Sequence, residues 1–140
     1  MGRILAIDYG RKRVGLAVSD PNKIIANMLA TVETHLLWEF LQKYFMNEQV
    51  EVVVVGYPLQ MNNTASEAVV YINPFLKKFK AKFPDIRLEI VDERFTSKMA
   101  TRTLVEGGMK KMARRKKELV DAISATIILQ SYMEQKRFGH

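Results

Sequence analysis

The stretch from residue 3 to residue 20 constrains the fold most strongly, because it predicts a β-hairpin that carries an acid. Residues 4–7 form a short apolar run typical of a strand buried on both faces, and the run ends at Asp8. A basic turn follows, and residues 14–18 then alternate as a second, paired strand would. Since the chain continues as a strand and not as a helix, the carboxylate is better explained by a bound cation than by capping.

Positive charge is in excess, since 22 lysines and arginines against 15 acids leave a net charge of +7 over 140 residues. This balance favours polyanionic partners, above all nucleic acid. The cations are clustered, which favours phosphate contacts over a merely well-solvated basic surface. The two clusters are Arg11, Lys12 and Arg13, and Lys110, Lys111, Arg114, Arg115, Lys116 and Lys117.

The composition also excludes several classes of protein. The absence of cysteine excludes disulfides and thiolate metal sites. No apolar run is long enough to cross a bilayer, and no apolar stretch with a cleavage site opens the chain. We therefore expect a cytoplasmic protein without a membrane partner, folded as a single domain over residues 1–140.

The periodicity of the apolar residues predicts an α/β fold with helices on both faces of a mixed five-stranded sheet. Three antiparallel strands come first, and two parallel strands reached by right-handed crossovers follow. The expected strands are at 4–7, 14–18, 24–32, 50–55 and 87–91, and the expected helices at 36–45, 69–83, 97–105 and 118–136.

Two of these helices carry further expectations. Pro74 lies inside the second helix and predicts a kink near Asn73, because proline removes a helix hydrogen bond. The last helix is expected to be deeply buried, because apolar residues cover much of its circumference. These residues are Leu119, Val120, Ile123, Ile127 and Ile128.

Acids fall where the crossovers would bring them to one edge of the sheet. Asp8 ends the first strand, Asp92 and Glu93 end the last strand, and Asp121 lies in the first turn of the final helix. Convergent carboxylates repel unless a divalent cation neutralises them, and oxygen ligands suit Mg²⁺ or Mn²⁺. Two such ions about 3.5–4 Å apart can activate a water for phosphodiester cleavage. Each acid has a structural alternative, such as capping a turn or a helix start, and the residues alone leave Asp92 and Glu93 both open.

Four stretches of the chain resemble the YqgF (RuvX) family, described as Holliday-junction resolvases or pre-16S rRNA nucleases with an RNase H-like fold. In order they are IDYGRKRVGLAVSD at 7–20, VGYPL at 55–59, VDERFTS at 91–97 and KKELVDAISA at 116–125. The resemblance implies that Asp8, Glu93 and Asp121 are the metal-binding and catalytic acids. It also implies that Arg13 and Arg94 support these acids or contact phosphate.

Two positions depart from the family pattern. Asn62 and Asn63 stand where an Asp-Gly pair is common, and asparagine still tolerates positive φ although a charge is lost. Ser124 replaces a common alanine on the last helix, where a backbone carbonyl one turn earlier can accept its hydroxyl hydrogen bond. All three acids that the family leads us to expect are present.

The leading hypothesis is a Mg²⁺- or Mn²⁺-dependent endonuclease that acts on structured nucleic acid, in 5′-end maturation of precursor 16S rRNA or in resolution of branched DNA. A nucleic-acid-binding ribosome-assembly factor without significant nuclease activity is the alternative, since it needs the same charge. An ATP-binding domain of the actin and hexokinase kind is disfavoured because no second Asp-x-Gly phosphate loop follows. Few large apolar residues interrupt the basic segment, which disfavours a membrane surface. Both a monomer and a homodimer remain open.

Overall fold

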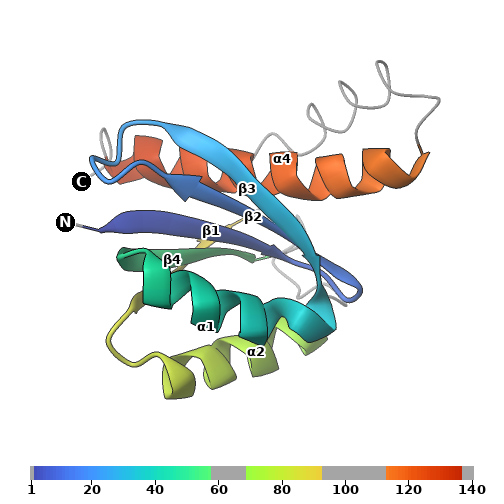
Figure 1. The fold of residues 1–140 in the computed structure, drawn as a ribbon, viewed down its shortest axis with the longest axis horizontal. Helices are drawn as coiled ribbons and strands as arrows, with labels where there is room; N and C mark the ends of the chain where they lie inside the picture. The colour runs from blue at the N-terminus through green and yellow to red at the C-terminus, as the bar shows by residue number, and fades with distance from the viewer. Residues whose placement is uncertain (1, 58–68, 93–112, 137–140) are drawn as a thin grey trace.

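The computed structural model describes residues 2–57, 69–92 and 113–136. These residues form one five-stranded sheet in the order β3-β2-β1-β4-β5, with helices on both faces (Figure 1). The strands are β1 (Arg3–Tyr9), β2 (Arg13–Ser19), β3 (Ala26–Glu33), β4 (Val50–Tyr57) and β5 (Arg87–Asp92). The described helices are the 3₁₀ turn η1 (Thr34–Leu36), α1 (Leu37–Asn47), α2 (Val69–Lys82) and α4 (Ala113–Glu134).

The sheet has the mixed topology that the sequence predicts. β1, β2 and β3 pair antiparallel, whereas β1 with β4 and β4 with β5 pair parallel. The predicted α/β class and sheet are therefore confirmed. Because parallel strands end at the same edge, the ends of β1, β4 and β5 share one edge, with Tyr57 paired to Asp92.

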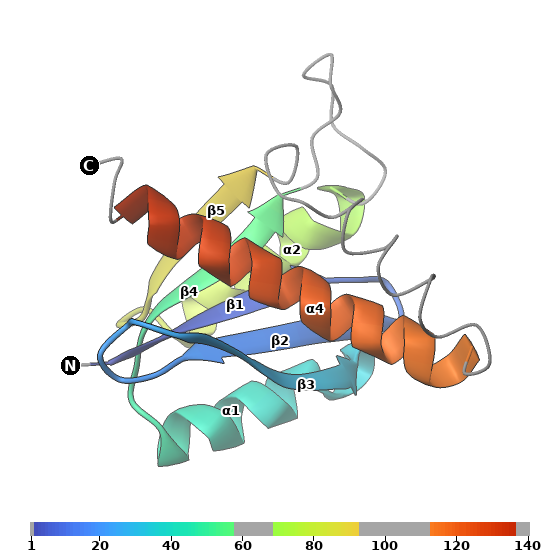
Figure 2. The same ribbon diagram turned by 90° about the horizontal axis from the view of Figure 1, so that it is seen from above.

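The two faces of the sheet have separate cores. α1 and α2 cover one face and α4 covers the other (Figures 1 and 2). Alternation along β1 sends Leu5 and Ile7 toward α1 and α2, whereas Ile4 and Ala6 pack toward α4. Strands buried on both faces need apolar side chains at successive positions, which explains the continuous apolar run in β1.

α4 lies close to the sheet because small residues line the contact. The helix lies mainly over β2, with β1 and β3 on either side. Ala122, Ser124 and Ala125 are buried on this helix. Under it, a Cβ atom at Gly15 would collide with the carbonyl oxygen of Asp121. Only a glycine at this position of β2 lets the two backbones approach so closely.

The expected burial pattern of the last helix was therefore wrong. Leu119, Val120, Ile123 and Ile127 are half-buried, and of the five apolar residues only Ile128 is buried. The physical reason is that α4 packs on the sheet with one face only, where small residues are buried near Asp121 and larger apolar residues are buried from Ile128 onward. Its other buried residues are Leu129, Tyr132 and Met133.

Several boundaries differ from the predictions. Within the described residues α4 begins at Ala113 and not at Glu118, because lysine and arginine are good helix formers and extend the helix. β4 extends to Tyr57, which pairs with β5, whereas the predicted strand ended at Val55. α2 continues through Pro74, and the kink there stays a prediction. The predicted helix at 97–105 and the residue pair Asn62 and Asn63 lie outside the described residues.

Candidate active site

The structure brings together two of the three predicted acids, Asp8 and Asp121. Asp8 lies near the end of β1 and pairs with Gly15 of β2. Strand alternation puts Asp8 on the same face as Ile4 and Ala6, which is the face that α4 covers. Asp121 lies over Gly15 itself, with its backbone against the glycine. The two acids, far apart in the sequence, therefore occupy neighbouring positions between β1 and α4.

Arg13 contacts one of these acids directly. It opens β2, and its Nε donates a hydrogen bond to Asp121 Oδ2 over 2.8 Å. The side chains keep 35% and 23% of their surface exposed, so the pair lies at the edge of the core and not inside it. Such a charge-assisted bond fixes the orientation of the carboxylate and offsets part of the negative charge of the two acids.

The last strand places one of the two candidates for the third acid, Asp92. Val91 packs in the cluster on the α4 side, so alternation places Asp92 on the opposite face, toward α1 and α2. Glu93 and Arg94 lie outside the described residues. Within the part of the chain that the structure describes, no group of three or more histidine, cysteine or acidic residues could hold a metal ion.

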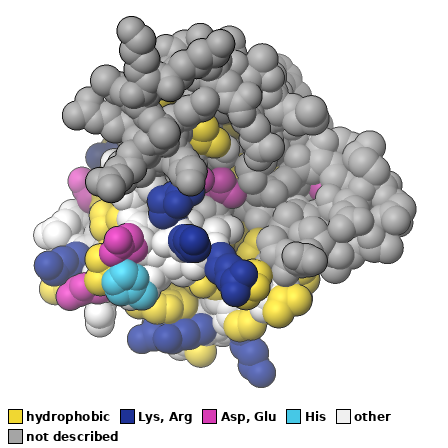
Figure 3. All heavy atoms as spheres, turned by 90° about the vertical axis from the view of Figure 1, so that its right-hand side faces the viewer, with side chains coloured by type: hydrophobic (Ala, Val, Ile, Leu, Met, Phe, Trp, Pro, Cys, Tyr) yellow, Lys and Arg dark blue, Asp and Glu magenta, His cyan; other side chains and the backbone are white. Residues whose placement is uncertain are grey.

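The predicted basic turn lies at the same edge as the acids. Arg11 and Lys12 are exposed, and Thr34 of η1 fixes their turn with two hydrogen bonds. Its amide donates to the Lys12 carbonyl over 2.9 Å, and its hydroxyl donates to the Gly10 carbonyl over 2.8 Å. In Figure 3, which faces this edge, lysine and arginine side chains gather beside acidic ones.

The second basic cluster is only partly described. Lys110 and Lys111 lie outside the described residues, whereas Arg114, Arg115, Lys116 and Lys117 belong to the first turns of α4. Asp121 follows on the same helix. The helix thus links four of the predicted phosphate-binding residues to an acid of the candidate site.

Two contacts at this edge were missed by sequence reasoning. Thr34 was not singled out, although a threonine ahead of a helix is a usual capping signal, and here it bonds to the turn instead. Tyr71 of α2 was missed because nothing in the sequence shows that its ring lies 5.0 Å from the Arg11 guanidinium. Such cation–π contacts depend on tertiary packing.

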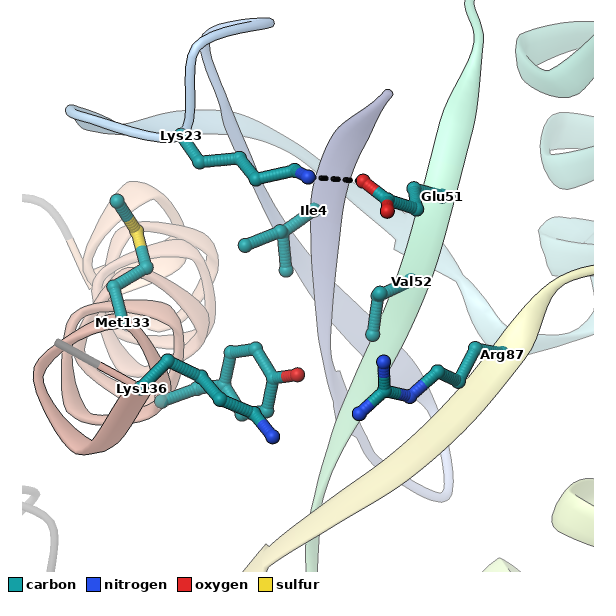
Figure 4. Close-up of a pocket in the computed structure, with 8 residues that line it drawn as sticks. Ile4, Lys23, Glu51, Val52, Arg87, Met133 and Lys136 are labelled. Atoms are coloured by element: carbon teal, nitrogen blue, oxygen red, sulfur yellow. Dashed lines mark ion pairs between the residues drawn. The ribbon is translucent and has the colours of Figure 1, made fainter. Parts of the chain in front are cut away.

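A second polar cluster, not predicted from the sequence, lies at the opposite edge (Figure 4). It surrounds a pocket of about 390 Å³ between α4 and the first residues of β1, β4 and β5. Each of the described cations that line it has a carboxylate partner. Lys23 pairs with Glu51, Arg87 Nη2 lies 2.8 Å from Glu89 Oε2, and Lys136 Nζ lies 3.7 Å from Glu89 Oε1. The cluster is therefore largely neutralised.

Comparison with known proteins identifies close relatives of this chain. Residues 2–135 match the model of the RuvX family, described as Holliday junction resolvase. A protein of Bacteroides thetaiotaomicron named "Putative pre-16S rRNA nuclease" is 56% identical over 138 residues, which cover 99% of this chain and 100% of the relative. A protein of the same name from Porphyromonas gingivalis is 58% identical over 134 residues, covering 96% and 97%.

Among solved structures, the fold is similar to that of Thermus thermophilus RuvC. The RuvC structure in complex with a Holliday junction substrate aligns with a TM-score of 0.56 and 17% identity, covering 96% of this chain and 97% of RuvC. At this identity the likeness shows the fold alone, and the RNase H-like prediction is confirmed. None of the described helices is long and apolar enough to cross a bilayer.

Proposed function

The chain belongs to the RuvX family, and we propose that it is a nuclease that hydrolyses phosphodiester bonds in precursor 16S rRNA. The observation that carries the proposal is the meeting of Asp8 and Asp121 across Gly15, with Arg13 bonded to Asp121. The relatives named for pre-16S rRNA, similar along nearly their whole length, favour RNA over branched DNA as substrate.

Three acids form the proposed catalytic set. Asp8 and Asp121 share the α4 face of the sheet. Glu93 is proposed as the third acid in preference to Asp92, because Asp92 belongs to the opposite face by strand alternation. Arg13 is a positioning residue that holds one oxygen of Asp121 in place.

These residues fit a divalent cation by their chemistry. Carboxylate oxygens are the ligands that Mg²⁺ and Mn²⁺ prefer, and two neighbouring carboxylates gain from a shared cation because it relieves their repulsion. A bound cation would supply a Lewis acid for the phosphate and would lower the pKa of a coordinated water. Asp8, Glu93 and Asp121 are the residues proposed to hold it.

Binding of the substrate is assigned to the cations around this edge. Arg11 and Lys12 are exposed in the turn beside Asp8, and Arg114–Lys117 open the helix that carries Asp121. Lys110, Lys111 and Arg94 complete the proposed set. Cations on both sides of the acids would hold a phosphate backbone across them, independently of base sequence.

Cleavage assays with Asp8→Asn test the proposal. The substrates are a labelled precursor 16S rRNA fragment and a four-way DNA junction, each with Mg²⁺, Mn²⁺ or EDTA. We expect the wild type to cut the RNA only with metal. We expect Asp8→Asn to lower the rate by about 100-fold or more with binding retained, because a neutral amide replaces a charged carboxylate as the ligand of the cation. Asp85→Asn, the same change in an exposed turn away from the site, is the control and should cut normally.

The other outcomes separate the alternatives. If the enzyme cuts the DNA junction and not the RNA, the proposed substrate is branched DNA and not precursor 16S rRNA. Binding of RNA without cleavage under any metal condition would favour a ribosome-assembly factor. Normal cleavage by Asp8→Asn would remove Asp8 from the catalytic set.

A further inference from the structure

An open surface pocket on the other side of the basic turn is lined by aromatic and cationic side chains, the residue types that contact bases and phosphates. Its volume is about 540 Å³, within the range of small-molecule sites. Tyr9 and Trp38 give it aromatic walls, and Arg11, Lys12 and His35 line it as well. Figure 3 faces this edge and shows a histidine beside acidic and apolar side chains, with basic ones close by.

The pocket is built on rigid elements. The Tyr9 ring stacks on Phe75 with a centroid distance of 4.5 Å, and the Trp38 ring lies 5.1 Å from the same phenylalanine. Thr34 ties the turn that carries Arg11 and Lys12 to η1. A site that is held in place before binding loses little entropy when a ligand enters.

The charges of this pocket are available to a ligand, unlike those at the opposite edge. Among the described residues neither Arg11 nor Lys12 forms an ion pair with a carboxylate, whereas Lys23, Arg87 and Lys136 all do. Glu33, the one acid among the described lining residues, has its Oε2 3.5 Å from His35 Nε2. The pocket therefore offers two cations to an anion, next to aromatic surface.

We propose that this pocket binds one unpaired nucleotide of the RNA substrate, with its phosphate on Arg11 and Lys12 and its base against Trp38 and Tyr9. The proposal rests on the proposed nuclease function and adds a preference for single-stranded RNA beside the cut. A base inside a duplex cannot enter such a cavity, whereas an unpaired base can contact aromatic side chains. The strand would then cross the basic turn and reach Asp8 and Asp121 on the other side.

Trp38 makes the pocket directly observable, because it is the one tryptophan among 140 residues. We would titrate the full chain in EDTA with single-stranded oligouridine and with an RNA duplex of the same length. Tryptophan emission reports occupancy of the pocket, and the anisotropy of a labelled RNA reports binding anywhere. N-acetyltryptophanamide corrects for absorption by the RNA.

We expect saturable changes in Trp38 emission with the single strand and none with the duplex at equal anisotropy. Arg11→Gln combined with Lys12→Gln should raise the Kd for the single strand about tenfold or more and affect the duplex less. Lys43→Gln combined with Lys80→Gln removes the same charge from exposed positions of α1 and α2 and is the matched control. That control should stay within about twofold of the wild type.

Two results would contradict the proposal that this pocket binds a nucleotide. One is binding by anisotropy with unchanged Trp38 emission, and the other is an equal loss of single-strand and duplex binding in the Arg11 and Lys12 variant. Both leave the nuclease proposal standing, because cleavage is measured separately. Conversely, RNA that changes Trp38 emission but is never cut with Mg²⁺ or Mn²⁺ would contradict the nuclease proposal. The proposal that the pocket binds a nucleotide would then still stand.

Discussion

At the scale of single residues, Gly15 decides whether the two acids can meet. It pairs with Asp8 through the sheet and lies directly under the backbone of Asp121. Any side chain there would push α4 away from β2. The position of one catalytic acid relative to the other thus depends on the absence of a side chain between them.

Gly15→Ala should therefore impair both stability and cleavage. The added methyl would collide with the Asp121 carbonyl oxygen, and overpacking of this kind costs about 1–3 kcal/mol of the free energy of unfolding. Urea unfolding measures the stability, and the RNA assay measures the rate. Asn27→Ala, on the exposed edge strand β3, is the control and should change neither. Unchanged stability of Gly15→Ala would show that α4 is farther from β2 than described.

The sequence predicted those parts of the site that depend on neighbouring residues in the chain. It did not predict the parts that depend on packing between distant segments. The hairpin around Asp8 is a local pattern of apolar and turn residues, and it was predicted correctly. The packing face of α4 near the site was not, because hydrophobicity favoured Leu119 and Ile123, whereas this part of the helix packs through Ala122 and Ala125. Two backbones can approach closely only where the side chains between them are small, and hydrophobicity does not measure this property.

At the scale of elements, α4 connects a basic segment to the candidate site. Arg114 and Arg115 belong to its first turns, and Asp121 lies further along the same helix. An element that both carries an acid and opens with cations can bring phosphate and acid together. These cations were expected to precede the helix, because the predicted helix began at Glu118.

Replacing Lys110, Lys111, Arg114 and Arg115 by alanine should weaken binding to all RNA sequences. Cations that contact phosphates release counterions, so the variant should also show a flatter dependence of log Kd on log salt. The slope should fall by about 0.7 for each lost contact with a single strand. Anisotropy titrations over a salt series measure it, and an unchanged urea midpoint serves as the folding control. An unchanged slope would place these four residues away from the RNA.

At the scale of the whole molecule, the two edges of the sheet are electrostatically different. The edge with Asp8 carries exposed Arg11 and Lys12. At the opposite edge Lys23 pairs with Glu51 (Figure 4), and Arg87 and Lys136 share Glu89. The net charge of +7 therefore does not describe how the charge is distributed between the two edges. The opposite edge serves instead to join α4 to β4 and β5.

That junction should contribute to the pH dependence of stability in the alkaline range, together with Tyr9 and Tyr44, whose pKa values burial also raises. Burial, and then the hydrogen bond that its hydroxyl donates to Glu89 over 2.6 Å, raise the pKa of Tyr132 far above its ordinary value of 10.0. A pKa raised by folding stabilises the native state fully below the pKa of the unfolded chain. As the pH rises above 10, the unfolded chain loses the phenolic proton first, and this stabilisation is lost progressively up to the folded pKa.

We therefore expect the free energy of unfolding to fall steeply above pH 10 in the wild type. Tyr132→Phe should be less stable at neutral pH, because Glu89 loses a donor, but its stability should fall less steeply over the alkaline range. Urea unfolding at a series of pH values measures both effects. Tyr71→Phe, at a more exposed tyrosine, should keep the wild-type slope. If the free energy of unfolding falls equally steeply with pH in Tyr132→Phe and in the wild type, the Tyr132 phenol has the same pKa in the folded and unfolded chains. The hydrogen bond to Glu89 would then not raise the pKa of Tyr132.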